Sequence, residues 1–269
     1  MKFFSFFLVI YSILSFSAEA NHWERMQERT EVPDPTGISH VQEHAISAYD
    51  SGNLKGAFEW FTKWAVEHDN PYGQFRLANM YFDGLGIVKD RKQAVKWFLE
   101  SAKQGYRKSQ DRLALMYLKG QGVSQDFSSA AKWFKKAAEG SEDIEVTDVK
   151  IRSDAQISLA ILYRDGRGVE QSDVMAFQWF RKAADQHEST SSETNLGDAF
   201  AQATVGEMYE AGRGTKQNAE EAYKWYRMAA DQGDSVAQRH LARLYREGIG
   251  VSKNESEADK WSRLAEEGE

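Results

Sequence analysis

The sequence predicts an all-α fold in which antiparallel helix pairs stack into an α-solenoid. The first observation is a repeat, because one pattern of tyrosine, two glycines, alanine and tryptophan occurs five times. Its tryptophans are 36, 46, 46 and 36 residues apart, and its tyrosines and glycines keep the same steps. The second observation is helical spacing of the apolar residues in each copy. Such repeats are typical of arrays that grow by stacking. The tryptophans are Trp97, Trp133, Trp179, Trp225 and Trp261.

Composition supports this class and excludes others. With 41% hydrophobic and 28% charged residues and a mean hydropathy of −0.64, the chain resembles a soluble, mostly helical protein rather than a disordered one. Its net charge of −7 lacks the basic character of a nucleic-acid binder, so we expect no nucleic-acid partner. The chain contains no cysteine, so its stability must come from packing without disulfides.

Residues 1–20 differ from the rest of the chain and predict a secretory signal peptide. Lys2 precedes an apolar run interrupted only by serines, and the segment ends in Ala18-Glu19-Ala20, a typical cleavage site. A membrane anchor is the alternative, but the run is shorter than the roughly 20 residues that span a bilayer. We therefore expect cleavage after Ala20, export to the periplasm or the medium, and no membrane insertion after cleavage.

Two segments precede the regular repeats. Residues 21–38 lack the repeat pattern and contain two of the three prolines, which indicates an exposed leader or linker. Residues 39–72 predict a degenerate helix pair that looks like a tetratricopeptide unit. In it Tyr49 and Trp60 are 11 residues apart, whereas the later tyrosine–tryptophan pairs are 16 apart. This different spacing suits a cap at the N-terminal end of the array.

The regular unit can be interpreted position by position. Its first helix carries an apolar stripe, as in Leu77, Ala78 and Tyr81, and a glutamine always stands seven residues before the tyrosine. We expect this amide to bond backbone groups of the neighbouring turn. Of the two glycines that follow, the first suits a left-handed helix end and the second a close approach to the neighbouring unit. The second helix is predicted to bury its alanines and its tryptophan.

Two units carry ten extra residues each, near 141–153 and near 188–198. Insertions in a helical array usually form loops on one edge, and this edge often carries function. The alternative is loop growth without function, because added loop length costs little free energy.

The recurring unit Ala-Gln-x-x-Leu-Ala-x-x-Tyr-x-x-Gly-x-Gly-Val, followed by Ala-x-x-Trp-Phe-x-x-Ala-Ala, resembles the Sel1-like repeat, a relative of the tetratricopeptide repeat. The resemblance covers residues 73–269 as five repeats. It implies a right-handed superhelical α-solenoid that acts as an adaptor in protein complexes, and an exported bacterial member of the family. The absence of cysteine separates this chain from the family branch that has a disulfide in each repeat.

Two short motifs offer catalytic alternatives. His40-Val41-Gln42-Glu43-His44 matches the pattern of inverted zinc peptidases, but the repeats identify no third ligand. Ser129-Ala130-Ala131-Lys132 matches the Ser-x-x-Lys of penicillin-interacting enzymes, but its companion motifs are absent. The sequence therefore predicts no catalytic, metal-binding or cofactor-binding residues and no cofactor.

Function is expected on first-helix positions that vary between units while the repeat pattern stays fixed. Arg239, Arg243 and Arg246 are spaced to share one helix face, which could receive a partner's carboxylates. The alternative is a solvated face paired with the nearby Glu247. The predicted protein-binding residues are Arg76, Asn79, Arg112, Glu207, Arg239 and Arg243.

Together these patterns predict a non-enzymatic scaffold of the cell envelope that binds a protein or peptide on the concave face of the solenoid. One alternative is a periplasmic regulator or assembly factor of an envelope complex. A less favoured alternative is a hydrolase acting on cell-wall or β-lactam substrates.

Overall fold

The computed structural model describes residues 38–140, 146–185 and 198–268. The predicted signal peptide, nearly all of the predicted leader and most of the second insert lie outside these residues. The chain divides into two compact units, residues 1–41 and 42–269, and the repeats belong to the second unit.

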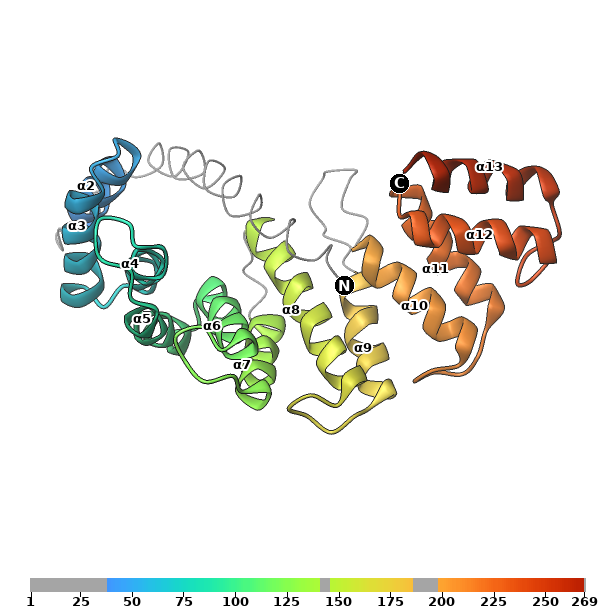
Figure 1. The fold of residues 1–269 in the computed structure, drawn as a ribbon, viewed down its shortest axis with the longest axis horizontal. Coiled ribbons are helices and arrows are strands. Elements are labelled where there is room, and N and C mark those ends of the chain that lie inside the picture. The colour runs from blue at the N-terminus through green and yellow to red at the C-terminus, as the bar shows by residue number, and fades with distance from the viewer. Residues whose placement is uncertain (1–37, 141–145, 186–197, 269) are drawn as a thin grey trace. The chain divides into compact units, whose positions relative to one another are not determined.

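The described residues form twelve α-helices and no strands, which follow one another as consecutive antiparallel pairs (Figure 1). This confirms the predicted α-solenoid of stacked helix pairs. The pairs are α2 (Ile38–Asp50) with α3 (Leu54–Glu67), α4 (Pro71–Asp83) with α5 (Arg91–Lys103), α6 (Arg107–Lys119) with α7 (Phe127–Glu139), α8 (Val146–Asp165) with α9 (Asp173–Ala184), α10 (Ala199–Ala211) with α11 (Ala219–Asp231), and α12 (Ser235–Glu247) with α13 (Glu255–Glu267).

From α3 to α13 each helix packs against the next one along the chain, so each first helix from α4 onward lies between two second helices. Alanine permits this close approach because it adds almost no side-chain volume between the helix axes. The five recurring alanines before the tryptophans are completely buried, and the aromatic residues Phe98, Phe134, Phe180 and Tyr226 fill the interior beside them. The predicted burial of the alanine and tryptophan positions is confirmed for Ala222, Trp225 and Ala229. The alanines are Ala94, Ala130, Ala176, Ala222 and Ala258.

The two glycines of each repeat perform the predicted tasks. Gly84 adopts a left-handed conformation with φ 81°, and its N–H donates to the Met80 carbonyl to close the end of α4. A Cβ on Gly86 would lie 2.1 Å from the Leu54 carbonyl oxygen at the start of α3. The second glycine is therefore required because the turn touches the backbone of the preceding unit.

The recurrent glutamine joins consecutive helices. The Gln110 side chain donates to the Ala102 carbonyl at 3.1 Å, and the Gln238 side chain donates to the Ala230 carbonyl at 3.2 Å. Its partner is thus a free carbonyl in the last turn of the preceding second helix. Equivalent bonds of 3.3–3.5 Å occur in the other units and link Gln74 to Ala65, Gln156 to Ala138 and Gln202 to Ala184.

The first insert is helical where the structure describes it. Residues 146–153 form the first two turns of α8, which has 20 residues, whereas the other first helices have 13. The expectation of a loop is wrong for these residues. Their N-terminal extension of α8 includes Val149, which is buried with 7% of its surface exposed.

No helix within the described part of the chain combines the length and the apolar character that crossing a bilayer requires.

Candidate protein-binding site

The first helices of successive pairs differ at a few positions, which are most easily compared by counting from the recurrent glutamine. We call the surface formed by α4, α6, α8, α10 and α12 the first-helix face. Position −2 on these helices is Tyr72, Lys108, Asp154, Phe200 and Val236. Position +2 is Arg76, Arg112, Ser158, Thr204 and His240.

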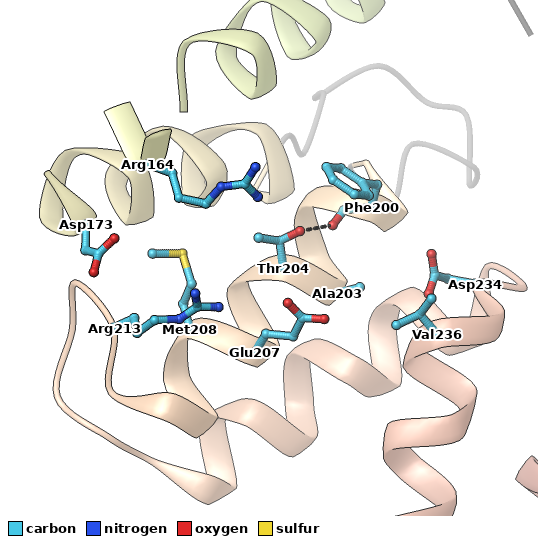
Figure 2. A pocket seen from close by; sticks show the side chains of 10 residues that line it. All are labelled: Arg164, Asp173, Phe200, Ala203, Thr204, Glu207, Met208, Arg213, Asp234 and Val236. Carbon is cyan, nitrogen blue, oxygen red and sulfur yellow. Dashed lines mark hydrogen bonds between the residues drawn. The ribbon is translucent and has the colours of Figure 1, made fainter. Parts of the chain in front are cut away.

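A pocket of about 180 Å³ lies on this face between the end of α8, the length of α10 and the start of α12 (Figure 2). Five of its lining residues lie on α10. They are spaced three and four positions apart, so they form one stripe on that helix. The stripe consists of Phe200, Ala203, Thr204, Glu207 and Met208.

Two apolar residues of the pocket are open to solvent. Phe200 is 48% exposed and Val236 is 39% exposed, although their −2 counterpart Tyr72 is only 8% exposed. The Thr204 hydroxyl donates to the Phe200 carbonyl one turn back at 2.8 Å, which satisfies this polar group within its own helix. An exposed aromatic ring next to an aliphatic side chain is typical of sites that receive an apolar surface from a partner.

The charged groups of the pocket come from several elements. Arg164 at the end of α8 pairs with Asp165 at 2.9 Å, and Arg213 stands in the α10–α11 turn. Figure 2 shows Arg213 and Asp173 at one end of the pocket and Asp234 at the other, with Glu207 between them. The pocket therefore offers both signs of charge around an apolar patch.

Next to the pocket, a polar cluster joins α10 and α11 to α12. The Glu210 carboxylate accepts hydrogen bonds from the Arg243 guanidinium and, at 2.9 Å, from the Tyr226 hydroxyl. The His240 ring stacks on Tyr226 with centroids 4.4 Å apart, and its Nε2 lies 3.8 Å from the Glu207 carboxylate. Burial would raise the pKa of Glu210, but the bonds from Arg243 and Tyr226 hold that pKa below its ordinary value.

The arginines of α12 have different surroundings. Arg243 also lies 3.4 Å from the Glu247 carboxylate, and Arg246 lies 3.5 Å from the Asp259 carboxylate. Arg243 and Arg246, which were expected to share one helix face, are thus held by carboxylates of this chain. Arg239 is exposed on α12.

Arg76 of α4 is buried inside the array. Its guanidinium lies over the rings of Tyr49 and Phe61, at 4.5 and 4.9 Å from their centroids, and donates to the Tyr72 hydroxyl at 2.6 Å. With 7% of its surface exposed, Arg76 contacts the preceding pair rather than solvent. Asn79 is also 7% exposed, and its amide donates to the Phe75 carbonyl at 2.9 Å.

Arg112 lies on α6, partly buried beside Asp111. Burial raises the pKa of Asp111 to about 7, Arg112 lowers it, and the negative charge of Asp154 on α8 raises it further. Of the six predicted residues, Glu207 lines the pocket and Arg243 belongs to the neighbouring cluster through its bond to Glu210. Arg76, Asn79 and Arg112 lie on α4 and α6.

Several residues of the pocket were not among the predicted site residues. Phe200 and Val236 share position −2 with Lys108 and Asp154, so the available signal was a position that changes between apolar and charged residues. Arg164 and Arg213 give no comparable signal in the sequence. They reach the pocket because the end of α8 and the turn after α10 both border it.

The residues of the two short catalytic motifs make structural contacts within their own helix pairs. The Ser129 hydroxyl donates to Asp126 at 2.6 Å in the N-terminal cap of α7, while Lys132 is exposed. The His44 ring lies tilted against the Trp60 ring, with centroids 4.8 Å apart. In the ranges that the structure describes, no group of three or more acidic, histidine or cysteine side chains is placed to hold a metal ion.

Comparisons with known proteins agree with this architecture. A Sel1 repeat protein from Oxalobacter formigenes superposes with a TM-score of 0.69 and is 29% identical, and the match covers 84% of both chains. A protective antigen of uropathogenic Escherichia coli with the SLR fold also has a TM-score of 0.69. It is 30% identical, and the match covers 86% of this chain and 48% of the antigen.

One curated relative matches a shorter stretch. It is an exopolysaccharide production negative regulator from Rhizobium leguminosarum bv. viciae, 30% identical over 104 residues. The match spans 39% of each of the two chains.

The family model described as the Sel1 repeat matches six stretches, which together make up most of the chain. The first is short and falls in the degenerate pair, and the other five begin at or near the first helices of the regular pairs. The stretches are residues 50–65, 71–106, 107–141, 153–187, 199–234 and 235–268. With this match and the stacked helix pairs, the chain belongs to the Sel1 repeat family.

Proposed function

We propose that this chain is a non-enzymatic scaffold of the cell envelope that binds a protein or peptide through the pocket between α8, α10 and α12. Sel1 repeat proteins generally mediate protein–protein interactions and are typically non-catalytic scaffolds. The observation that carries the proposal is the exposed pair Phe200 and Val236 beside charged groups in one pocket.

The size of the pocket favours a macromolecular partner. Sites for small molecules usually measure about 300–1,000 Å³, whereas this pocket measures about 180 Å³. It suits one side chain of a larger partner, whose neighbouring residues would extend along the first-helix face. An anchor side chain in a pocket with a polar rim is the usual arrangement of energetically important contacts.

Photo-crosslinking tests this proposal by position. A photoreactive amino acid replaces Phe200 or Arg239 on the first-helix face, or Lys224 or Lys260 on the second helices as matched exposed controls. We expect covalent adducts with one defined protein from the first two positions and not from the controls. Equal adducts from all four positions, or none from Phe200 and Arg239, would contradict the proposal.

The cellular location is part of the proposal and rests on residues 1–20. N-terminal sequencing of the protein purified from its native host tests it directly. We expect the mature chain to begin at Asn21 and to fractionate with the periplasm or the medium. A mature protein that retains Met1 would contradict export by signal cleavage.

A second candidate is a regulatory function, which the similarity to the exopolysaccharide regulator favours. A scaffold can regulate by holding or withholding a partner, so the same face would serve both functions. Deletion of the gene would change exopolysaccharide output if this candidate is correct. Unchanged output, with crosslinks still formed at position 200, would leave the scaffold without this regulatory task.

A further inference from the structure

Positions −2 and +2 carry different side chains in α4 and in α10. In α4 the guanidinium of Arg76 at position +2 lies 5.6 Å from the ring centroid of Tyr72 at position −2, and that tyrosine is 8% exposed. In α10 position +2 is Thr204, and the ring of Phe200 at position −2 is 48% exposed. The pocket therefore lies beside positions that a guanidinium and a ring occupy in α4.

The charge of the pocket favours a cation. Its lining contains two arginines and three carboxylates, which leaves one net negative charge. Arg164 is in addition paired with Asp165, so its charge is partly neutralised. The carboxylates of Glu207 and Asp234 lie along the α10–α12 part of the pocket, with Phe200 and Val236 in the same part (Figure 2).

A guanidinium fits this combination better than an ammonium does. Arginine stacks on aromatic faces and pairs with carboxylates through a planar group that is weakly hydrated. The fold already uses such contacts internally, since Arg76 lies over Tyr49 and Arg167 lies 4.1 Å from the ring centroid of Phe127. Val236 and Ala203 offer an apolar surface to the stem of the incoming side chain.

We propose that the pocket receives an arginine side chain of the partner, with its guanidinium on the Phe200 ring and paired with Glu207. This proposal rests on the proposed function and assigns the chemistry of the partner at the same site. The guanidinium would thus make with Phe200 the contact that Arg76 makes with Tyr72 in α4.

Methyl NMR of the full chain tests the assignment, because Ala203, Thr204, Met208 and Val236 place methyl groups around the pocket. The probes are the N-acetyl methylamides of arginine, lysine, citrulline and glutamate. We expect saturable shifts of these methyls with arginine, weaker binding of lysine, and no saturable shifts with uncharged citrulline or with glutamate. Equal binding of citrulline, stronger binding of glutamate, or no response to arginine would overturn the assignment.

Variants then locate the contact. Phe200→Ala is expected to weaken arginine binding about two- to fivefold. Glu207→Gln is expected to weaken it as well, and Thr204→Arg to abolish it because the chain then supplies its own guanidinium. Glu220→Gln, an exposed carboxylate at the start of α11, is the control expected to bind normally. Unchanged binding by Phe200→Ala and Thr204→Arg would overturn the site, and the methyl spectrum of each variant shows whether it is folded.

The two proposals fail separately. Crosslinks at position 200 without any response to the arginine probe would overturn the arginine assignment alone. An arginine response without crosslinks at position 200 would overturn the proposed function alone.

Discussion

The first helices α4 and α10 occupy the same place in the repeat, yet one is closed and the other open. In α4 the variable side chains Tyr72 and Arg76 pack on each other and on the preceding pair, and both are at least nine-tenths buried. In α10 the corresponding Phe200 is half exposed above a pocket. The repeat pattern thus determines how the helices pack. A few variable positions determine whether the side chains on a first helix are buried inside the array or exposed to a partner.

The largest expected effect concerns the tryptophan packing that the repeats share rather than the difference between α4 and α10. Trp179 is 4% exposed, so Trp179→Ala should lower the free energy of unfolding by about 3–5 kcal/mol. Trp97, at the same repeat position, is only partly buried, and Trp97→Ala should cost less. Thermal melts followed by circular dichroism check both, and an unchanged midpoint for Trp179→Ala would contradict its place in the core.

The next prediction compares two glycines with a left-handed conformation, of which only one also contacts the backbone of another unit. A Cβ at Gly214 would lie 2.0 Å from the Asp173 carbonyl oxygen, whereas a Cβ at Gly233 would meet nothing within 4 Å. Both glycines have positive φ. Gly233→Ala should therefore cost about 1–2 kcal/mol, and Gly214→Ala about 1–3 kcal/mol more from the added clash. Denaturant unfolding measures the difference. Equal losses of unfolding free energy in the two variants would show that the contact between units adds no constraint at Gly214.

Substitutions at position +2 compare the stability of α4 and α10 directly. Arg76→Ala removes the guanidinium from two rings and from the Tyr72 hydroxyl, so it should cost about 1–3 kcal/mol. Thr204→Ala removes a bond within its own helix and a few atoms of a buried side chain, so it should cost less, about 0.5–1.5 kcal/mol. If both variants unfolded at the same denaturant concentration, α4 would not be the closed counterpart of α10.

A further prediction is a pH dependence of stability between α6 and α8. Burial and the charge of Asp154 raise the pKa of Asp111 to about 7, above its unfolded value of about 3.8. The unfolded chain releases this proton first, so the stability that Asp111 contributes is complete below pH 3.8 and is lost as the pH rises to about 7. Asp111→Asn should flatten this part of the stability profile, as measured by denaturant unfolding between pH 4 and 8. A slope equal to that of the wild type would show that Asp111 is not its source.

The sequence predicted the features that repeat and missed those that depend on how units meet. The tyrosines, paired glycines, alanines and tryptophans indicated the helix pairs because each feature acts within or next to its own unit. The partner of Gln110 could be predicted only as a backbone group, since its identity depends on where the preceding helix ends. Residues 146–153 were expected to form a loop because their extra length was visible and their continuity with α8 was not.

The candidate site was predictable only in part for the same reason. Glu207 and Arg243 were selected as variable positions; Glu207 lines the pocket, and Arg243 bonds Glu210, three residues further along α10. Arg76 was selected by the same criterion, but the aromatic rings that bury it come partly from the preceding pair. Whether a variable residue faces solvent depends on side chains of a neighbouring unit, which the pattern of one unit does not contain.

The central claim is that the pocket beside the half-exposed Phe200 on α10 binds the partner, whereas the corresponding Tyr72 on α4 is buried by its own chain. The direct measurement is the yield of photo-crosslinked partner from position 200 in the wild-type background and in Thr204→Arg. We predict a strong adduct in the first and its loss in the second, with Glu220→Gln unchanged. An adduct of equal yield in the folded Thr204→Arg protein would contradict the claim.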